Sequence, residues 1–290
     1  NSATVSGNKE GIFAFGEPTT DITNLISDAG VVAADSSGVG TARFKPTACE
    51  YGEDKGIIGF GHDGSGNISI TNLVSNAGVV ASDQAATTGT ARRTPGGCDY
   101  GGDKGIFAYG EISTATAISN LISNAGVVAS DTAGVGTARY SIAACEYGED
   151  KGIFGFGTPT TAVTNLVSSA GVIANDQATV TGTARGSPAA CSYGAPPKDK
   201  GIFGFGAGPT GVTNLVSNTG VVSTDVAAVG TARYGPSATQ YGGNKGIFGF
   251  GGTPSAVALT NLVSSAGVVA SDQATVTGTA RTSSAACSFN

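Results

Sequence analysis

The sequence repeats one short motif six times, and this repetition restricts the folds open to the chain more than any other feature. The clearest copy of the motif is Asp150–Gly157. Successive repeats start 46, 49, 47, 49 and 45 residues apart, near Lys9, Lys55, Lys104, Lys151, Lys200 and Lys245. A period in the forties is typical of β-propellers and of helical solenoids. We therefore expect a repeat protein in which each unit is one supersecondary element.

Composition separates these two classes. Each unit is rich in Gly, Val, Thr, Ile and aromatic residues, and the chain contains no Met. This composition favours strands and turns over helices. In the fourth unit, turn residues separate four short apolar segments: Lys151–Gly157, Val163–Val167, Gly171–Asp176 and Ala189–Tyr193. Four strands per unit predict an all-β, six-bladed β-propeller of four-stranded antiparallel blades, formed by residues 1–290 as a single domain.

The segment Lys151–Gly157 is apolar on both faces. If it is a strand throughout, Ile153 and Gly155 face one way and Phe154 and Phe156 the other. A strand buried on both sides fits a blade with a neighbour on each face better than a sheet with one solvent face. The missing side chain at Gly155 would leave room for an aromatic ring from the next blade.

The units also alternate between two forms. From the repeated Asp to the following Arg, odd units span 8 positions, as from Asp131 to Arg139. Even units span 9, as from Asp176 to Arg185. The building block is therefore a pair of units, which predicts pseudo-threefold symmetry within the sixfold ring.

The chain carries seven candidates for six inner strands. Five precede the later repeats, Ala285–Phe289 ends the chain, and Ser2–Asn8 precedes the first repeat. Ala285–Phe289 matches the repeat better than Ser2–Asn8 does. We expect it to pair with Lys9–Gly16 and complete the first blade, because this removes an open sheet edge. The alternative is that it completes a blade of the next molecule and links propellers into a filament.

Charge and hydropathy argue against two kinds of partner. The formal net charge is −6, which disfavours nucleic-acid binding. No apolar run approaches the ~18 residues of a membrane span, so no membrane insertion is expected. The five cysteines occupy one equivalent position, and Thr239 takes that position in the remaining copy. We expect these cysteines to be small buried residues rather than disulfide partners or metal ligands.

Six Asp and six Arg residues recur at equivalent positions. They are Asp35 and Arg43, Asp83 and Arg92, Asp131 and Arg139, Asp176 and Arg185, Asp225 and Arg233, and Asp272 and Arg281. A ligand-binding ring is one interpretation. The expected one is a set of structural ion pairs, with each guanidinium bonding the carboxylate or backbone carbonyls between blades. Six equivalent sites also argue against catalysis, which needs one asymmetric constellation.

The polar insert His62–Asn67 contains the single histidine of the chain. His62, Asp63 and Asn67 are the candidate binding residues of this loop. The regular ligand spacing of a calcium loop is missing, and a lone His is weak evidence for base catalysis. The sequence contains no phosphate loop, nucleophile elbow or clustered metal-ligand motif. No catalytic residue, metal or cofactor is therefore expected.

The order of elements resembles the kelch repeat, in which an Arg precedes an inner strand and an Ile-Tyr-hydrophobic-Gly-Gly strand follows. Arg185, the strand through Cys191 and Tyr193, and Lys200–Gly206 follow this order, but the kelch Trp is absent. The repeat contains Thr-Asn-Leu-Val-Ser-Asn, then Gly-Val-Val-Ala-Ser-Asp, Gly-Thr-Ala-Arg and Tyr-Gly-Gly-Asp-Lys-Gly-Ile-Phe. This sequence also resembles repeat proteins of uncultured environmental phages and bacteria. That resemblance implies a virion-associated or extracellular structural role.

Three classes of function are compatible with these features. The first is a non-catalytic structural or adhesion protein of a virion, tail appendage or extracellular surface. Its partners would be other assembly proteins or further copies of the chain. The second is a carbohydrate-binding propeller that uses the variable loops Glu17–Asp21, His62–Asn67, Glu111–Thr116 and Gly251–Ala256. The third, a hydrolase or lyase, would need an asymmetric polar cluster in the central channel. The sequence indicates only repeated small residues there, so no enzyme is expected.

Overall fold

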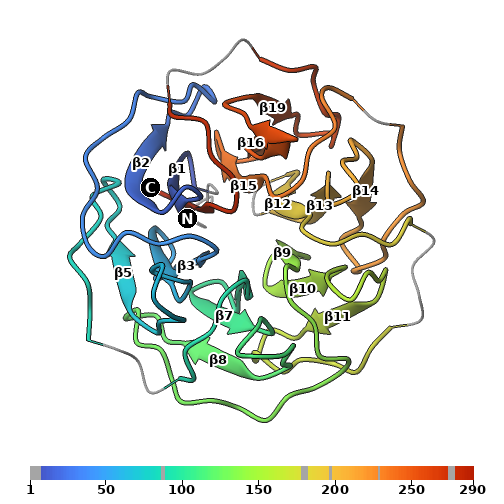
Figure 1. Ribbon diagram of the computed structural model, residues 1–290. Coiled ribbons are helices and arrows are strands. Elements are labelled where there is room, and N and C mark those ends of the chain that lie inside the picture. The colour runs from blue at the N-terminus through green and yellow to red at the C-terminus, as the bar shows by residue number, and fades with distance from the viewer. Residues whose placement is uncertain (1–7, 86–88, 178–181, 196–197, 228, 274–277) are drawn as a thin grey trace, which may run out of the picture.

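The computed structural model describes residues 8–85, 89–177, 182–195, 198–227, 229–273 and 278–290. Within these residues the protein is all-β and contains no helix. Six three-stranded antiparallel sheets are arranged in a propeller-like ring around a central axis (Figure 1). A short hairpin of β17 (Gly252–Thr253) and β18 (Ser255–Ala256) is separate from the sheets.

Each sheet has an inner, a middle and an outer strand. The sheets, numbered 1 to 6, are β20-β1-β2, β3-β4-β5, β6-β7-β8, β9-β10-β11, β12-β13-β14 and β15-β16-β19. The inner strands are β20 (Ala285–Phe289), β3 (Thr47–Tyr51), β6 (Gly96–Tyr100), β9 (Ala143–Tyr147), β12 (Ala189–Tyr193) and β15 (Ser237–Tyr241). The middle strands are β1 (Glu10–Gly16), β4 (Lys55–Gly59), β7 (Lys104–Ala108), β10 (Lys151–Gly155), β13 (Lys200–Gly204) and β16 (Lys245–Gly249). The outer strands are β2 (Thr20–Ile26), β5 (Thr71–Val74), β8 (Ser119–Ile122), β11 (Thr164–Val167), β14 (Thr213–Val216) and β19 (Thr260–Val263).

The C-terminal strand completes the first sheet, as predicted. β20 pairs with β1 in five successive positions, from Glu10 opposite Phe289 to Ala14 opposite Ala285. Each inner strand also contacts the inner strands of both neighbouring sheets, including β15 with β20. Glu10 rather than Lys9 takes the place that Lys55 has in sheet 2. Of the competing segment Ser2–Asn8, only Asn8 lies within the described residues.

The prediction of four-stranded blades is wrong, because the third of the four predicted segments, Gly171–Asp176 in the fourth unit, forms no strand. In sheet 4, the only bridge of this segment joins Ile173 to Val167. The Asn165 side chain donates from Nδ2 to the Ala174 carbonyl at 3.0 Å. A side-chain amide thus takes the acceptor that a regular ladder would give to a backbone N–H. The outermost segment therefore follows the sheet without becoming a strand.

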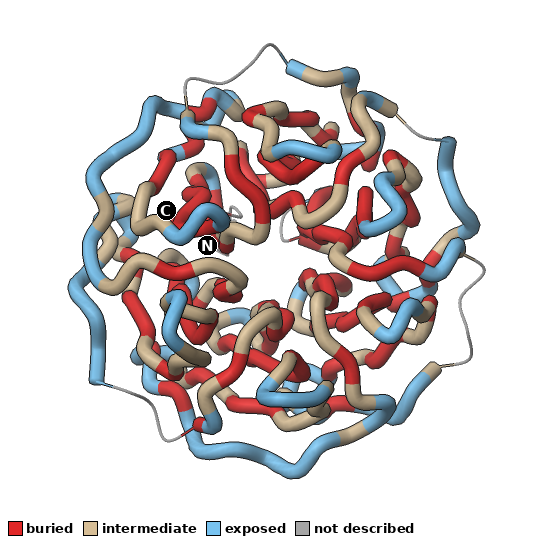
Figure 2. Tube along the Cα trace, viewed as in Figure 1, coloured by how far each residue is buried: buried red, intermediate tan, exposed pale blue. Residues whose placement is uncertain are grey.

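The apolar core lies between sheets, as the two-faced middle strands predict. It forms six clusters, such as that of Ile153 in sheet 4 with Phe203 in sheet 5. A methyl group added at Gly155 would lie 2.8 Å from the Phe203 ring, so the glycine does make room for the neighbouring ring. Buried residues concentrate in the sheets and exposed ones along the rim (Figure 2).

The middle strand of sheet 4 is shorter than predicted. It ends at Gly155, because the next residue, Phe156, has a positive φ of 62°. A left-handed φ is rare for a bulky residue, yet an aromatic residue at this position has one in every unit. The bend turns the Phe156 ring toward Arg185, whose guanidinium lies 4.1 Å from the ring centre.

The pseudo-threefold alternation falls largely on residues 86–88, 178–181 and 274–277, which lie outside the described residues. A described part of it is a side-chain hydrogen bond in even units. Thr71 donates to Gln84, and Thr164 donates to Gln177, each at 2.8 Å.

Candidate functional site

The repeated arginines are buried between neighbouring sheets. Arg185, only 2% exposed, lies between sheets 4 and 5. It donates from Nη2 to Asn214 Oδ1 at 2.7 Å and from Nη1 to the Thr183 carbonyl at 3.1 Å. Burial lowers the pKa of Arg185 to about 10, although the nearby Asp225 carboxylate opposes this shift. The guanidinium therefore joins two sheets through an amide, a carbonyl and the Phe156 ring.

The repeated aspartates are held by hydrogen bonds from the chain segment that links the sheets. Asp225 accepts from the Thr183 backbone N at 3.0 Å and from Asn214 Nδ2 at 2.8 Å. Burial alone would raise the pKa of Asp225, but these bonds outweigh burial and lower it. The carboxylate is thus a fixed structural acceptor.

The structure does not place the Asp and the Arg of the same unit together. Each Arg lies beside the Asp of the following unit, and three of these pairs are ion pairs at the outer limit of the distance. Arg43 and Asp83 are 4.0 Å apart, Arg139 and Asp176 4.0 Å, and Arg233 and Asp272 3.8 Å. The remaining Arg–Asp neighbours are Arg92 with Asp131, Arg185 with Asp225, and Arg281 with Asp35. The offset arises because each Arg precedes the inner strand of the next sheet.

The His62–Asn67 loop uses its polar groups to hold its own shape and its neighbour. His62 Nδ1 accepts from the Gly64 N at 2.9 Å, and Asp63 accepts from the Ser65 and Gly66 N atoms. These backbone donors lower the pKa of Asp63. Asn67 Nδ2 donates to the Glu111 carbonyl at 3.0 Å. The loop side chains therefore have structural partners, although Asn67 Oδ1 is buried without a hydrogen-bond partner among the described residues.

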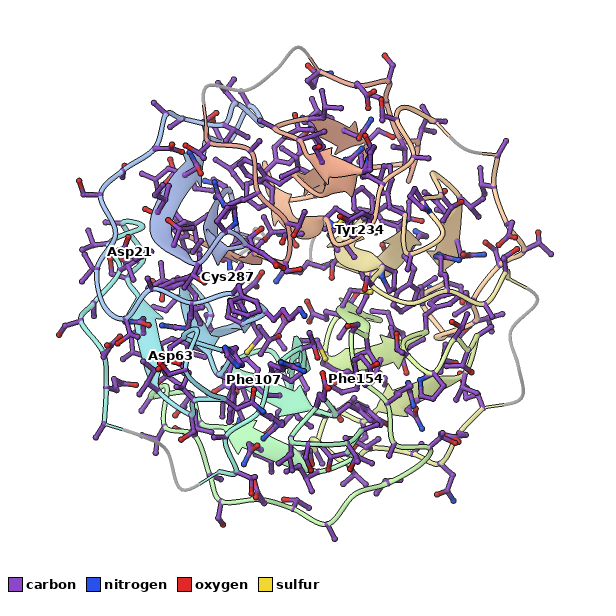
Figure 3. All side chains as sticks on the ribbon, viewed as in Figure 1. Asp21, Asp63, Phe107, Phe154, Tyr234 and Cys287 are labelled. Atoms are coloured by element: carbon purple, nitrogen blue, oxygen red, sulfur yellow. The ribbon has the colours of Figure 1, made fainter. Side chains whose placement is uncertain are left out.

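Two of the four variable loops meet at one end of the ring. Glu17, Pro18 and Ala256 line an open cavity of about 410 Å³, here called the loop-side cavity. The segments leading into the inner strands complete it with Tyr234 and several hydroxyl side chains. In Figure 3, Tyr234 lies near the central axis.

All five cysteines are buried and free, as expected. Each thiol packs against the glycine that opens the middle strand of a neighbouring sheet, as Cys49 does with Gly105. Burial raises the pKa of Cys191 to about 12. Cys287, labelled in Figure 3, belongs to β20 beside the axis. These protonated, buried thiols fill space in the core, and their protonated form does not suit metal binding.

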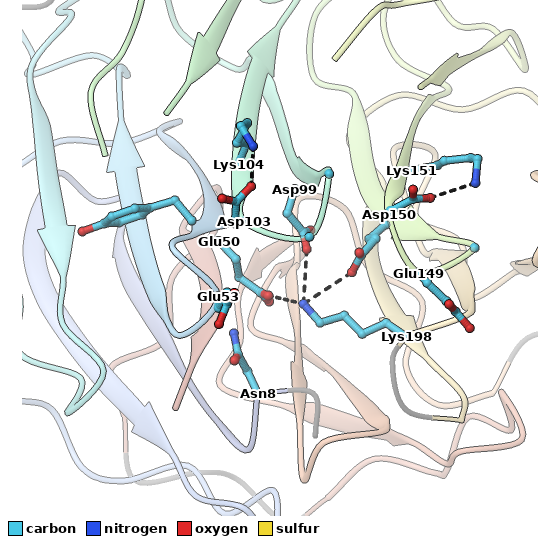
Figure 4. A pocket seen from close by; sticks show the side chains of 15 residues that line it. Asn8, Glu50, Glu53, Asp99, Asp103, Lys104, Glu149, Asp150, Lys151 and Lys198 are labelled. Carbon is cyan, nitrogen blue, oxygen red and sulfur yellow. Dashed lines mark hydrogen bonds and ion pairs between the residues drawn. The ribbon is translucent and has the colours of Figure 1, made fainter. Parts of the chain in front are cut away.

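The end of the ring opposite the loop-side cavity holds a second, acidic cavity. It measures about 840 Å³ and is lined by the turns that follow the inner strands of sheets 2, 3 and 4; we call it the turn-side cavity (Figure 4). Its lining carboxylates are Glu50, Glu53, Asp99, Asp103, Glu146, Glu149 and Asp150. The expectation of only repeated small residues along the central channel is therefore wrong, and with it the argument that this expectation gave against a hydrolase or lyase.

The asymmetry comes from one position of the repeat, the residue after the inner-strand Cys or Thr. This position is acidic in sheets 2, 3 and 4 and neutral in the others: Glu50, Asp99, Glu146, Ser192, Gln240 and Ser288. Two of the neutral residues donate hydrogen bonds to two of the acidic ones. Ser288 donates from Oγ to Glu50, and Ser192 donates from Oγ to the Glu146 carbonyl at 3.0 Å.

Lys198 brings an ammonium group to the three carboxylates. It lies in the turn between β12 and β13 and is 7% exposed. Its Nζ pairs with Glu50, lies 3.3 Å from Asp99 Oδ2, and lies 3.5 Å from Glu146 Oε2 (Figure 4). One ammonium group is therefore the ion-pair partner of three carboxylates, each from a different sheet.

Burial and crowding change the acidity of this cluster. Burial, with the nearby Asp99, raises the pKa of Glu146 well above its ordinary value. Burial also raises the pKa of Glu50, although Lys198 opposes the shift. For Lys198, burial disfavours the charged form, but the three carboxylates outweigh it and raise the pKa. Lys198 thus stays charged, whereas Glu146 and Glu50 hold a proton more readily than ordinary carboxyl groups.

Two signals in the sequence could have revealed this site. The repeat position after the Cys varies in charge where its neighbours are nearly constant, as at Glu146 and Ser192. In addition, the turn containing Lys198 is longer than the corresponding turns of the other units. Neither signal shows that these residues meet, because that depends on the closure of the ring.

Comparison with known proteins leaves the sequence without a relative to guide assignment: no family model matches the chain, and no curated protein matches it. The kelch-like resemblance therefore stays an interpretation. The part of the chain that the structure describes has no helix long and apolar enough to cross a membrane. In the same residues, no group of three or more His, Cys, Asp or Glu is arranged to hold a metal ion.

Proposed function

We propose that the chain is a non-catalytic structural or adhesion module: a six-bladed β-propeller that belongs to a virion, tail appendage or extracellular surface assembly. The setting rests on the resemblance of the repeat to those of environmental phages and bacteria. The proposal that the chain is a structural or adhesion module rests on one feature of the surface, a valine that is exposed at the same place in every unit.

These six valines are presented identically around the ring. They are Val31, Val79, Val127, Val172, Val221 and Val268, each 64–65% exposed. Each closes a tight turn after an outer strand. In sheet 4, Ser168 N donates to the Val172 carbonyl at 3.0 Å, and Val172 N donates to Ser168 Oγ at 3.2 Å.

An apolar side chain held rigidly at six equivalent places is suited to repeated contacts with a symmetric partner. A single exposed valine needs no explanation. Six with the same exposure form a multivalent surface, on which weak contacts add together. The turns are also fixed to the ring, because Asn124 Nδ2 donates to Asp103 Oδ2 at 3.1 Å. The proposed partner is an assembly that contains further copies of this chain.

Replacing the six valines with serine tests this proposal. We expect the unaltered protein to self-associate with increasing concentration in sedimentation velocity, and the six-serine variant to stay monomeric. The melting temperature should change little, because the side chains are exposed. A matched control replaces Val39 and Val226, which are exposed but lie outside the six equivalent turns. An unaltered protein that stays monomeric at every concentration would contradict the assembly role.

The loop-side cavity supports a second candidate, carbohydrate binding. Tyr234 lies there among the hydroxyl side chains of Ser141, Ser187 and Thr282. An aromatic face with nearby hydroxyl groups offers a sugar both stacking and hydrogen bonds. A glycan array separates the candidates: specific retention that Tyr234→Ala removes favours carbohydrate binding over a purely structural role.

A further inference from the structure

The turn-side cavity has more acidic groups than basic ones. Seven carboxylates and three ammonium groups line it, which is an excess of four acidic groups over basic ones, although the raised pKa values of Glu146 and Glu50 reduce the charge that these two carry. Lys104 pairs with Asp103 at 2.5 Å and Lys151 with Asp150 at 2.8 Å. Lys198 alone serves the three carboxylates at the centre. An excess of acidic groups attracts a cation.

An unpartnered amide points into the same cavity. Asn8 is 4% exposed and lines the cavity, and its Nδ2 has no hydrogen-bond partner among the described residues. Its side chain extends toward Glu53 and Glu50 in Figure 4. The residue is held in place because its carbonyl accepts from Gln240 Nε2 at 3.1 Å. A buried donor without a partner is costly, so its retention points to an acceptor on a ligand.

From these features we propose that the turn-side cavity is a binding site for an alkylammonium ligand, in which Lys198 occupies one of several cation positions. The chemistry of the ligand follows from Lys198 itself, since a primary ammonium already fits among Glu50, Asp99 and Glu146. The remaining carboxylates provide places for further ammonium groups. The Asn8 amide would bind a carbonyl or hydroxyl oxygen next to one of them.

Two sources supply this chemistry, a free polyamine and a lysine-bearing peptide segment. Both carry primary ammonium groups on flexible alkyl chains, which suit a compact carboxylate cluster. Only the peptide also carries carbonyl oxygens that could accept from the Asn8 amide. A cavity of about 840 Å³ has the size of ordinary small-ligand sites. The site differs from the valine surface, so it can be tested whether or not the protein self-associates.

Calorimetric titration of the full chain with spermidine and with a blocked trilysine peptide tests the site. We expect saturable binding of at least one probe, and the probe that binds identifies the source. Tetramethylammonium chloride at equal ionic strength should give no binding, because it has no N–H donors. Asp99→Asn should weaken binding about tenfold, as the loss of one nearby charge predicts. Glu17→Gln, the matched control on the loop side, should leave binding unchanged.

The Lys198→Ala variant provides a second measurement. Its outcome differs between a lysine that occupies a cation position of the site and a lysine that is only structural. We expect this variant to melt at a lower temperature and the bound probe to restore the loss, because the probe's ammonium group replaces Nζ. No heat of binding from either amine, with no recovery of the Lys198→Ala melting temperature, would overturn the proposal. Equal binding by the Asp99→Asn and Glu17→Gln variants would also overturn it, as would saturable binding of calcium chloride alone.

Discussion

Removal of residues 285–290 will abolish the cooperative folding of the ring. β20 forms a five-position ladder with β1, and its loss would expose the backbone edge of β1. It would also remove Cys287 and Phe289, which are 3% and 1% exposed, from the core around Ile12 and Phe15. Loss of a buried Phe side chain alone costs about 3–5 kcal/mol, a large part of the about 5–15 kcal/mol that stabilises a domain.

Thermal circular dichroism and light scattering check this result. The truncated chain should show no cooperative transition, or should associate through its open edge. Phe289→Tyr is the matched control, because tyrosine occupies this position in the five other inner strands, and it should fold normally. A truncated chain that melts like the full-length protein and stays monomeric would show that β20 is not needed to complete the ring.

Replacement of Arg185 by alanine will lower the free energy of unfolding by about 3–5 kcal/mol, the range for losing one partner of a buried charged network. The variant leaves the Asn214 Oδ1 acceptor without its donor and removes the cation from the Phe156 ring. Arg185→Lys should restore little, because an ammonium lacks the planar fork that bonds the amide and the carbonyl together. Urea denaturation measures the change.

Arg93 is the matched control for this substitution, as the seventh arginine and the one outside the repeated position. It pairs with Glu111 at 2.8 Å, and its side chain is 30% exposed. Because exposed ion pairs contribute little, Arg93→Ala should cost less than about 1 kcal/mol. Equal losses for Arg93→Ala and Arg185→Ala would show that the buried network contributes no more to stability than a surface pair.

Local pattern predicted the sheets well because it depends on neighbours in sequence. Alternating apolar residues located the middle strands, and Gly155 correctly implied a ring from the next sheet. The pattern predicted a middle strand that is too long and a fourth strand that does not form, each for a physical reason. A left-handed φ at Phe156 ends the strand early, and the Asn165 side chain takes a carbonyl that a fourth strand would have used.

The polar sites could not be predicted in the same way, because they form between repeats. Six nearly identical units do not reveal whether Arg43 bonds within its own unit or with the next, and the structure places it beside Asp83. A prediction of the acidic cluster would have needed still more information. Glu50 and Lys198 are 148 positions apart and meet only because the ring brings sheets 2 and 5 to a common axis.

The closed ring depends most on the pairing of the two ends of one chain, and an engineered disulfide tests this pairing most directly. Ala14 and Ala285 are opposite each other in the β1–β20 ladder. Residues paired in this way have Cα atoms about 4.5–5.5 Å apart, within the range that a disulfide spans. Mass spectrometry of the oxidised Ala14→Cys, Ala285→Cys variant should find a monomer in which positions 14 and 285 of the same chain are linked. Disulfide-linked dimers or longer chains would contradict the account and would show that β20 completes the sheet of a neighbouring molecule.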